Sequence, residues 1–276
     1  MPSEMDGVGL TSLWVAAVRA VESERADAWF HDPFARALAG ARGFEILERA
    51  RALNPNAPPV LEARTRFIDE RVDDAVTRAR VDQVVILAAG MDARAFRLGS
   101  LARAHVFEID RDFVLDYKRE KIGAAKPVGA RTEVPVDLRD DWPAALERAG
   151  FDRARPAVFL VEGLLPYLEE KHARAIFERI DVLAAPKSVV LFDVNGRTAL
   201  ESPFMKPTLD LVRSLDAPWL FGTDEPESLF KEAKTWTMEV ELYGDVGIRY
   251  GRWPFPPIPR STPGVPQSFL VRATKR

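Results

Sequence analysis

Small and acidic residues follow two apolar runs in a pattern that could bind a nucleoside. The run at residues 84–87 ends at Ala88-Ala89-Gly90, three small residues that would let a ligand approach the backbone closely. The next run, residues 105–109, contains Glu108 and is followed by Asp110, so two acids are candidates for hydrogen bonds to ribose hydroxyls. Neighbouring parallel strands end at the same edge of a sheet, where ligands bind.

The glycine pattern argues against a dinucleotide as that ligand. A dinucleotide site needs G-x-G-x-x-G, because a diphosphate binds to backbone N–H groups at a helix start, whereas residues 88–93 read A-A-G-M-D-A. Asp92 would also repel a phosphate. A nucleoside that carries an amino acid fits better. S-adenosylmethionine is such a ligand, because an acid could meet its ammonium group and an arginine its carboxylate.

Other charged residues have both functional and structural interpretations. Glu162 directly follows a run apolar enough to be buried on both faces, so its carboxylate should lie at a cleft or be paired. Asp92 and Arg94 are close enough in sequence to form an ion pair that would hold the corner at residues 88–90, where the first apolar run ends. Asp110 and Asp137 could instead cap a helix or turn, and a solvated helix face would account equally well for the arginines listed next. These are Arg19, Arg64 and Arg66.

The residue inventory excludes several kinds of chemistry. The chain has no cysteine, and its three histidines, His31, His105 and His172, show no i, i+4 pair, so we expect no metal site. None of the histidines occupies an obvious base position, and we expect His105 and His172 to be solvated. A net charge of -3 without a Lys/Arg cluster argues against nucleic acid as a partner.

The periodicity of apolar residues predicts elements that alternate between helix and strand. Residues 11–51 and 60–80 have helical spacing and are separated by the proline-rich loop 54–59. Strands are expected at residues 84–87, 105–109, 134–136, 157–161 and 188–192, alternating with helices at residues 113–121, 142–149 and 169–183. This alternation is typical of a parallel sheet flanked by helices, and strands at 236–242 and 268–273 suggest an antiparallel edge.

The chain is therefore expected to be one α/β structural domain. Its predicted architecture is a Rossmann-like doubly wound sheet, mostly parallel with an antiparallel C-terminal edge pair, plus an N-terminal helical lid. Residues 1–80 would form a helical cap, 81–195 the nucleoside-binding core, 196–235 a helical lid insertion and 236–276 the strands that complete the sheet. No run approaches the roughly 18 apolar residues of a membrane span, and we expect a cytoplasmic protein without membrane contact.

The order and spacing of seven stretches resemble a known family. The chain is similar to class I S-adenosylmethionine-dependent methyltransferases of the leucine carboxyl methyltransferase type, which include bacterial enzymes that methylate carboxyl groups in polyketide and other specialised-metabolite pathways. The matching stretches are LWVAAVRAVES (13–23), FHDPFARALAG (30–40), ARTRFID (63–69), VILAAGMDARAFRL (85–98), VFEIDR (106–111), VDLRDDW (136–142) and LVEGLLPYL (160–168).

The resemblance implies roles for particular residues. Ala88 and Gly90 would hold the methionine part of S-adenosylmethionine, and Asp110 its ribose. Asp137 and Leu138 would border the adenine. These assignments place the nucleoside across the ends of the first three strands.

Two further positions follow from the same family pattern. Arg64 would grip the cofactor carboxylate, and Glu162 would face the methionyl ammonium and the methyl-transfer site. The family's usual L-G-A-G is L-A-A-G here, so a positive φ at Ala88 would cost about 1 kcal/mol and its Cβ could crowd the cofactor.

The family also implies methylation of a small-molecule carboxylic acid to a methyl ester. A carboxylate is ionised near neutral pH and needs no general base, which agrees with the absence of a placed histidine. Tyr167 and an arginine such as Arg19 could orient this carboxylate. Aromatic residues of the expected lid suit an apolar acceptor, namely Trp14, Trp29, Phe30, Phe204, Trp219 and Phe221. Alternatives are a hydroxyl O-methyltransferase, methylation of a protein C-terminus, a nicotinamide-dependent oxidoreductase and a non-catalytic S-adenosylmethionine binder.

Overall fold

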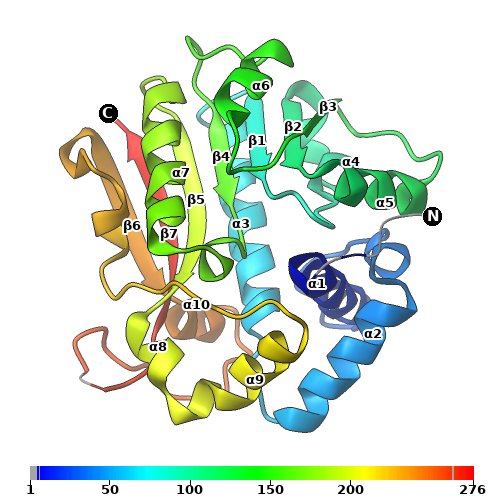
Figure 1. Ribbon diagram of the computed structural model, residues 1–276, viewed down its shortest axis with the longest axis vertical. Helices are drawn as coiled ribbons and strands as arrows, with labels where there is room; N and C mark the ends of the chain where they lie inside the picture. Colours follow the sequence, from blue (N-terminus) through cyan, green and yellow to red (C-terminus); the bar gives the residue numbers. More distant parts are fainter. Residues whose placement is uncertain (1–4, 6, 263) are drawn as a thin grey trace.

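The computed structural model describes residues 5, 7–262 and 264–276, and these form a seven-stranded sheet in the order β3-β2-β1-β4-β5-β7-β6 (Figure 1). Strands β1 to β5 are parallel, and β7 runs antiparallel to both β5 and β6. The predicted α/β Rossmann-like sheet with an antiparallel C-terminal edge pair is thus confirmed. The strands are β1 Gln83–Leu87, β2 His105–Asp110, β3 Ala130–Pro135, β4 Val158–Val161, β5 Val189–Asn195, β6 Trp236–Leu242 and β7 Ser268–Lys275.

Two regions differ from the sequence prediction for physical reasons. Strand β3 begins at Ala130 rather than at residue 134, because it is an edge strand whose polar side chains break the apolar pattern. Between β6 and β7 the chain forms helix α10, Tyr243–Arg249, where only a loop was expected. This helix has seven residues, two of them glycines, and is too short for its periodicity to stand out.

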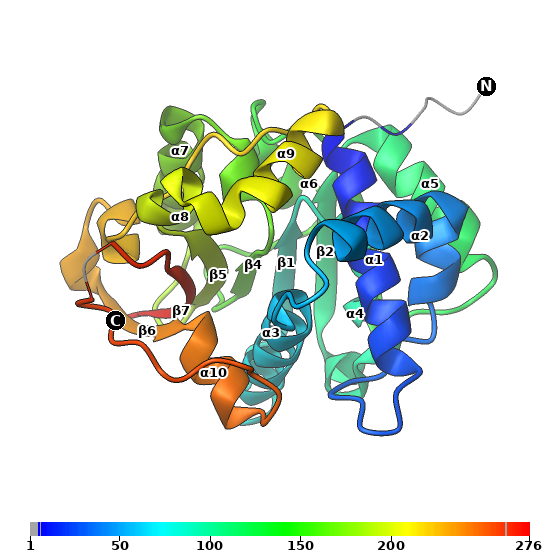
Figure 2. The ribbon, with the colours of Figure 1, turned by 90° about the horizontal axis from the view of Figure 1, so that it is seen from below.

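Helices cover both faces of the sheet and one of its ends. Figure 2 shows α6 and α7 on one face and α3 and α10 on the other. Helices α1, α2, α8 and α9 gather at the end toward which β4 points (Figure 1). The helices are α1 Gly7–Ser23, α2 Ala35–Leu53, α3 Val60–Thr77, α4 Arg94–Arg97, α5 Asp112–Ile122, α6 Trp142–Arg148, α7 Glu170–Leu183, α8 Arg197–Glu201, α9 Lys206–Ser214 and α10.

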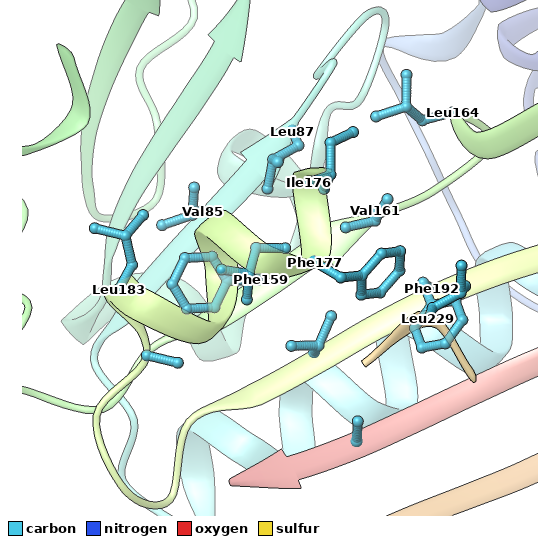
Figure 3. Packing of buried hydrophobic residues seen from close by; sticks show 14 of the residues in the cluster. Val85, Leu87, Phe159, Val161, Leu164, Ile176, Phe177, Leu183, Phe192 and Leu229 are labelled. Atoms are coloured by element: carbon cyan, nitrogen blue, oxygen red, sulfur yellow. The ribbon is translucent and has the colours of Figure 1, made fainter. Parts of the chain in front are cut away.

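The alternation of side chains along each strand builds two cores. Val85 and Phe159 face the cluster that includes Ile176 and Phe177 of α7 (Figure 3), whereas Val84 belongs to the cluster on the α3 face. Every residue of β1 is buried for this reason. A fully buried side chain of this size contributes roughly 1.5–3 kcal/mol to folding, so the sheet is a firm support for groups at its end.

The first two helices pack closely at a glycine. A Cβ at Gly43 of α2 would lie 2.4 Å from the carbonyl oxygen of Leu13 on α1, so only glycine allows this approach. The contact holds α1 against the rest of the helices at the carboxyl ends of the strands. No helix in the described part of the chain is both long and apolar enough to cross a membrane.

Candidate active site

A cavity of about 1280 Å³ lies at the carboxyl ends of the parallel strands. This volume exceeds the roughly 300–1,000 Å³ of a typical small-molecule pocket, so it can hold two ligands side by side. All eight site residues predicted from the sequence line it, and the structure therefore brings them together. They are Arg64, Ala88, Gly90, Asp110, Asp137, Leu138, Glu162 and Tyr167.

The corner after β1 has the tight backbone that its small residues suggested. Ala88 has a φ of 50° and Gly90 a φ of 43°, so both adopt the left-handed conformation. A Cβ at Gly90 would lie 3.1 Å from the Cβ of Ser12 on α1, which makes this position close to a neighbouring helix as well. Ala88 therefore carries strain that a glycine would not.

Of the two acids in β2, only Asp110 lines the cavity. Its Oδ2 accepts a hydrogen bond of 2.7 Å from the backbone N–H of Gly90, and its Oδ1 accepts one of 2.7 Å from Arg111 N–H. Burial raises the pKa of Asp110, and these two hydrogen bonds oppose the shift. Glu108 is fully buried elsewhere, 2.8 Å from Lys118 Nζ, and is structural.

Glu162 lies directly after β4 between two guanidinium groups. Its Oε1 is 2.9 Å from Arg64 Nε, and its Oε2 is 2.7 Å from Arg94 Nη1. Burial would raise the pKa of Glu162, but Arg94 and Arg64 outweigh burial and hold the pKa below its ordinary value. Gly163 follows with a φ of 62°, and a Cβ there would meet the Arg64 guanidinium at 3.2 Å.

Glu162 belongs to a buried network of ion pairs. Arg64 also bonds Asp193 of β5 at 3.1 Å, and Arg94 also bonds Asp69 of α3 at 2.7 Å. The members are Asp32, Asp69, Asp92, Glu162 and Asp193 with Arg19, Arg64, Arg94 and Arg97. Five carboxylates with four guanidiniums leave one net negative charge beside the cavity.

The ion pair of Asp92 with Arg94, expected from the sequence, is part of this network. Burial would raise the pKa of Asp92, but Arg94 and other cationic side chains lower it to about 2. Arg94 N–H also donates to Asp92 Oδ1 at 2.7 Å. The pair ties the corner after β1 to helix α4, which positions Gly90.

Two other predicted groups line the cavity. Asp137 and Leu138 follow β3, and both oxygens of Asp137 accept hydrogen bonds from Arg139, which lower its pKa. Tyr167 ends a short 3-10 helix, Leu165–Tyr167, after Glu162. The backbone of Leu220 donates to the Pro166 carbonyl at 2.6 Å, so the segment after α9 is attached next to Tyr167.

Several other sequence expectations need correction. Arg19 is buried and bonds Asp32 at 2.9 Å, so it is not on a solvated helix face. His172, expected to be solvated, is half-buried and lines the cavity, which does not contradict that expectation.

Only three of the six expected lid aromatics line the cavity, Trp14, Phe204 and Trp219. Trp29 packs edge-on against Tyr250 instead, with 5.4 Å between ring centroids. Phe30 is buried beneath the Arg97 guanidinium, and Phe221 belongs to the core on the α7 face.

Sequence reasoning missed Asp193 and the cavity-lining Glu62. Asp193 interrupts the apolar run of β5 just as Glu162 ends that of β4, so the same signal was available. Asp193 accepts hydrogen bonds from Arg64, from Gly163 N–H at 2.6 Å and from Tyr243 O–H at 3.1 Å. Glu62 lies in a helical segment, where no sequence pattern marks a single acidic residue as functional.

Known proteins share both the sequence and the fold. A family model described as leucine carboxyl methyltransferase matches residues 12–181. A Rhodococcus jostii protein named as a candidate S-adenosyl-L-methionine-dependent methyltransferase is 38% identical over 277 residues, covering 92% of this chain and 91% of that protein. A similarly named protein from Mycobacteroides abscessus is 43% identical over 266 residues, covering 90% and 85%.

A solved structure supports the same architecture. The crystal structure of a candidate methyltransferase from Thermobifida fusca has a TM-score of 0.62 at 19% identity and covers 87% of this chain and 92% of that one. At this identity the likeness concerns the fold alone.

Proposed function

The chain belongs to the leucine carboxyl methyltransferase family and is an S-adenosyl-L-methionine-dependent methyltransferase; from this premise we propose that it methylates a carboxylate of a small-molecule, specialised-metabolite acceptor. The acceptor would be a carboxylic acid and the product its methyl ester. The observation that carries the proposal is the net negative network beside the strained corner of Ala88 and Gly90.

The charges of the site fit this cofactor. S-adenosylmethionine has a sulfonium, an ammonium and a carboxylate, hence one net positive charge, and the network has one net negative charge. Glu162 is held ionised by its two arginines and would face the ammonium. Arg64 lies against Gly163 at the cavity wall, where its guanidinium would meet the cofactor carboxylate.

The hydrogen-bonding groups fit the nucleoside. Each oxygen of Asp110 accepts one backbone N–H and keeps a lone pair for a ribose hydroxyl. Asp137 and Leu138 would border the adenine, and Ala88 and Gly90 would lie under the methionine part. The corner offers no glycine-rich cradle for a diphosphate, which counts against a nicotinamide cofactor.

The chemistry then depends mainly on geometry. S-adenosylmethionine, when bound, supplies a methyl group that an acceptor oxygen takes as the C–S bond to the thioether breaks. The protein has to hold that oxygen in line with the C–S bond and keep water out. Tyr167, five residues after Glu162 and also lining the cavity, would orient the acceptor carboxylate. No general base is required, because the carboxylate is already ionised.

Two measurements test the proposal. Calorimetry should detect binding of S-adenosylhomocysteine, and no heat at millimolar ligand on folded protein would refute the cofactor site. Tritiated-methyl transfer to a panel of carboxylic acids, phenols and alcohols should label the acids as base-labile esters. Label on hydroxyl compounds alone would favour a hydroxyl O-methyltransferase, and label on none would indicate a non-catalytic binder.

A further inference from the structure

Glu62 differs from the other buried or half-buried acids that line the cavity. Each of those has a hydrogen-bonded partner; they are Asp92, Asp110, Asp137, Glu162 and Asp193. Glu62 is partly buried in the first turn of α3, and among the residues that the structure describes no side chain bonds its carboxyl. Its own backbone N–H partly offsets the effect of burial on the pKa of the carboxyl.

The surroundings of Glu62 contain charges of both signs. Glu22 and Arg252 lie close to it but form an ion pair with each other at 2.5 Å. Arg51, at the end of α2, is exposed and also lines the cavity. Burial raises the pKa of the Glu62 carboxyl, with Glu22 adding to the shift and the two arginines opposing it.

The carboxyl of Glu62 is half-buried and lines the cavity, so water can hydrate it when no ligand is present. The cavity is large enough for a second ligand beside the cofactor. A carboxyl that has no side-chain partner and lines such a space has the properties of a ligand-recognition residue.

The direction of Glu62 separates it from the methyl-transfer site. Successive residues of a helix are turned by about 100°, so Glu62 leaves α3 about 200° away from Arg64, which bonds Glu162. A ligand group at Glu62 would therefore lie on a different side of α3 from one held beside Arg64 and Glu162. Because Arg51 and Arg252 lie near, an ammonium group is disfavoured there. A hydroxyl can bond either protonation state of the carboxyl, since it both donates and accepts.

We propose that Glu62 binds a hydroxyl group of the acceptor, so that the acceptor is a hydroxy-substituted carboxylic acid. The inference rests on the proposed function, which supplies the carboxylate. The hydroxyl is a recognition group and is not methylated. Glu62 is thus a specificity-determining residue rather than a base.

The test compares matched acids by calorimetry in saturating S-adenosylhomocysteine. The pairs are 12-hydroxydodecanoic and dodecanoic acid, and 4-hydroxyphenylacetic and phenylacetic acid. Wild-type protein should bind at least one hydroxy acid roughly tenfold more tightly than its partner, as expected for one hydrogen bond to a carboxyl group. Glu62→Leu should abolish this preference and Glu62→Gln should keep part of it. Glu48→Gln, at an exposed position of α2 outside the cavity, is the matched control.

A stability measurement separates recognition from a structural role. Glu62→Leu should unfold at the same or a higher temperature than wild type, because it removes a poorly paired carboxyl. The inference is overturned if the two acids of each pair bind with equal affinity or do not bind at all. It is also overturned if Glu62→Leu keeps the preference for the hydroxy acid. Methyl transfer to unsubstituted acids with no preference would overturn it while leaving the proposed function intact, whereas failure to methylate any acid would refute that function.

Discussion

Ala88 allows the strain at the cofactor corner to be measured with a single methyl group. Its φ of 50° places an L-residue in the left-handed region, which costs about 1–2 kcal/mol. Replacing it with glycine relieves this strain, but the unfolded chain gains freedom worth about 0.4–1 kcal/mol. We therefore expect Ala88→Gly to raise the free energy of unfolding by about 0.5–1 kcal/mol.

Ala89 is the matched control because the same substitution should have the opposite sign there. Ala89 is buried and does not have a positive φ, so Ala89→Gly relieves no strain. It should lose about 0.4–1 kcal/mol through chain entropy and up to about 0.8 kcal/mol through the buried methyl group. The two variants should thus differ by about 1–3 kcal/mol, although they make the same chemical change at adjacent positions.

Urea unfolding monitored by circular dichroism measures both variants, and calorimetry with S-adenosylhomocysteine measures the site. Ala88→Gly should bind this ligand at least as tightly as wild type, because the Cβ that would border the methionine part is gone. If Ala88→Gly is destabilised as much as Ala89→Gly, the left-handed conformation of Ala88 is not strained, and the cost assigned to alanine in the L-A-A-G sequence is wrong.

Three further variants test the site. Asp92→Asn should lower the free energy of unfolding by about 2 kcal/mol at pH 7, because the pKa of Asp92 falls from 3.8 to about 2 on folding. This contribution is present above pH 3.8, should fall to about half at pH 3 and disappears as the pH drops through 2, so a pH-independent difference in urea unfolding would contradict it. Asp110→Asn should weaken S-adenosylhomocysteine binding roughly tenfold, since one hydrogen-bond acceptor is lost, while the circular dichroism spectrum stays unchanged. If this variant binds with wild-type affinity, Asp110 does not bind the ribose. Tyr167→Phe should raise the acceptor KM several-fold with little change in S-adenosylhomocysteine affinity, and an unchanged KM would rule out its orienting role.

The sequence predicted the parallel core of the sheet because its strands are buried on both faces. Runs such as residues 84–87 and 158–161 have no other simple interpretation between helical segments. The edge strand β3 and the short helix α10 were harder to predict from the sequence. Strand β3 is half exposed, and α10 contains two glycines. The local sequence pattern predicts secondary structure poorly wherever tertiary packing, rather than the periodicity of apolar residues, decides the structure.

The candidate site was predictable where a residue stands out against its own strand. Glu162 and Asp110 follow buried runs, and both reach the cavity. Arg64 needed the family resemblance, because nothing in a helix with several arginines marks one of them. The network that joins Asp69, Asp193 and Arg97 depends on the separate elements α3, α4 and β5, and no spacing in the chain predicts that they meet.

The position of β7 between β5 and β6 sets an order for assembly. Its residues, Ser268–Lys275, are made after those of both neighbours, yet they occupy an interior place in the sheet. During synthesis β6 has no partner strand until the ribosome has released residues 268–275, and one edge of β5 keeps unpaired backbone N–H and C=O groups until then. A premature stop codon that removes it would detach β6 and expose β5, so even a short truncation there should yield aggregated protein rather than a slightly weakened enzyme.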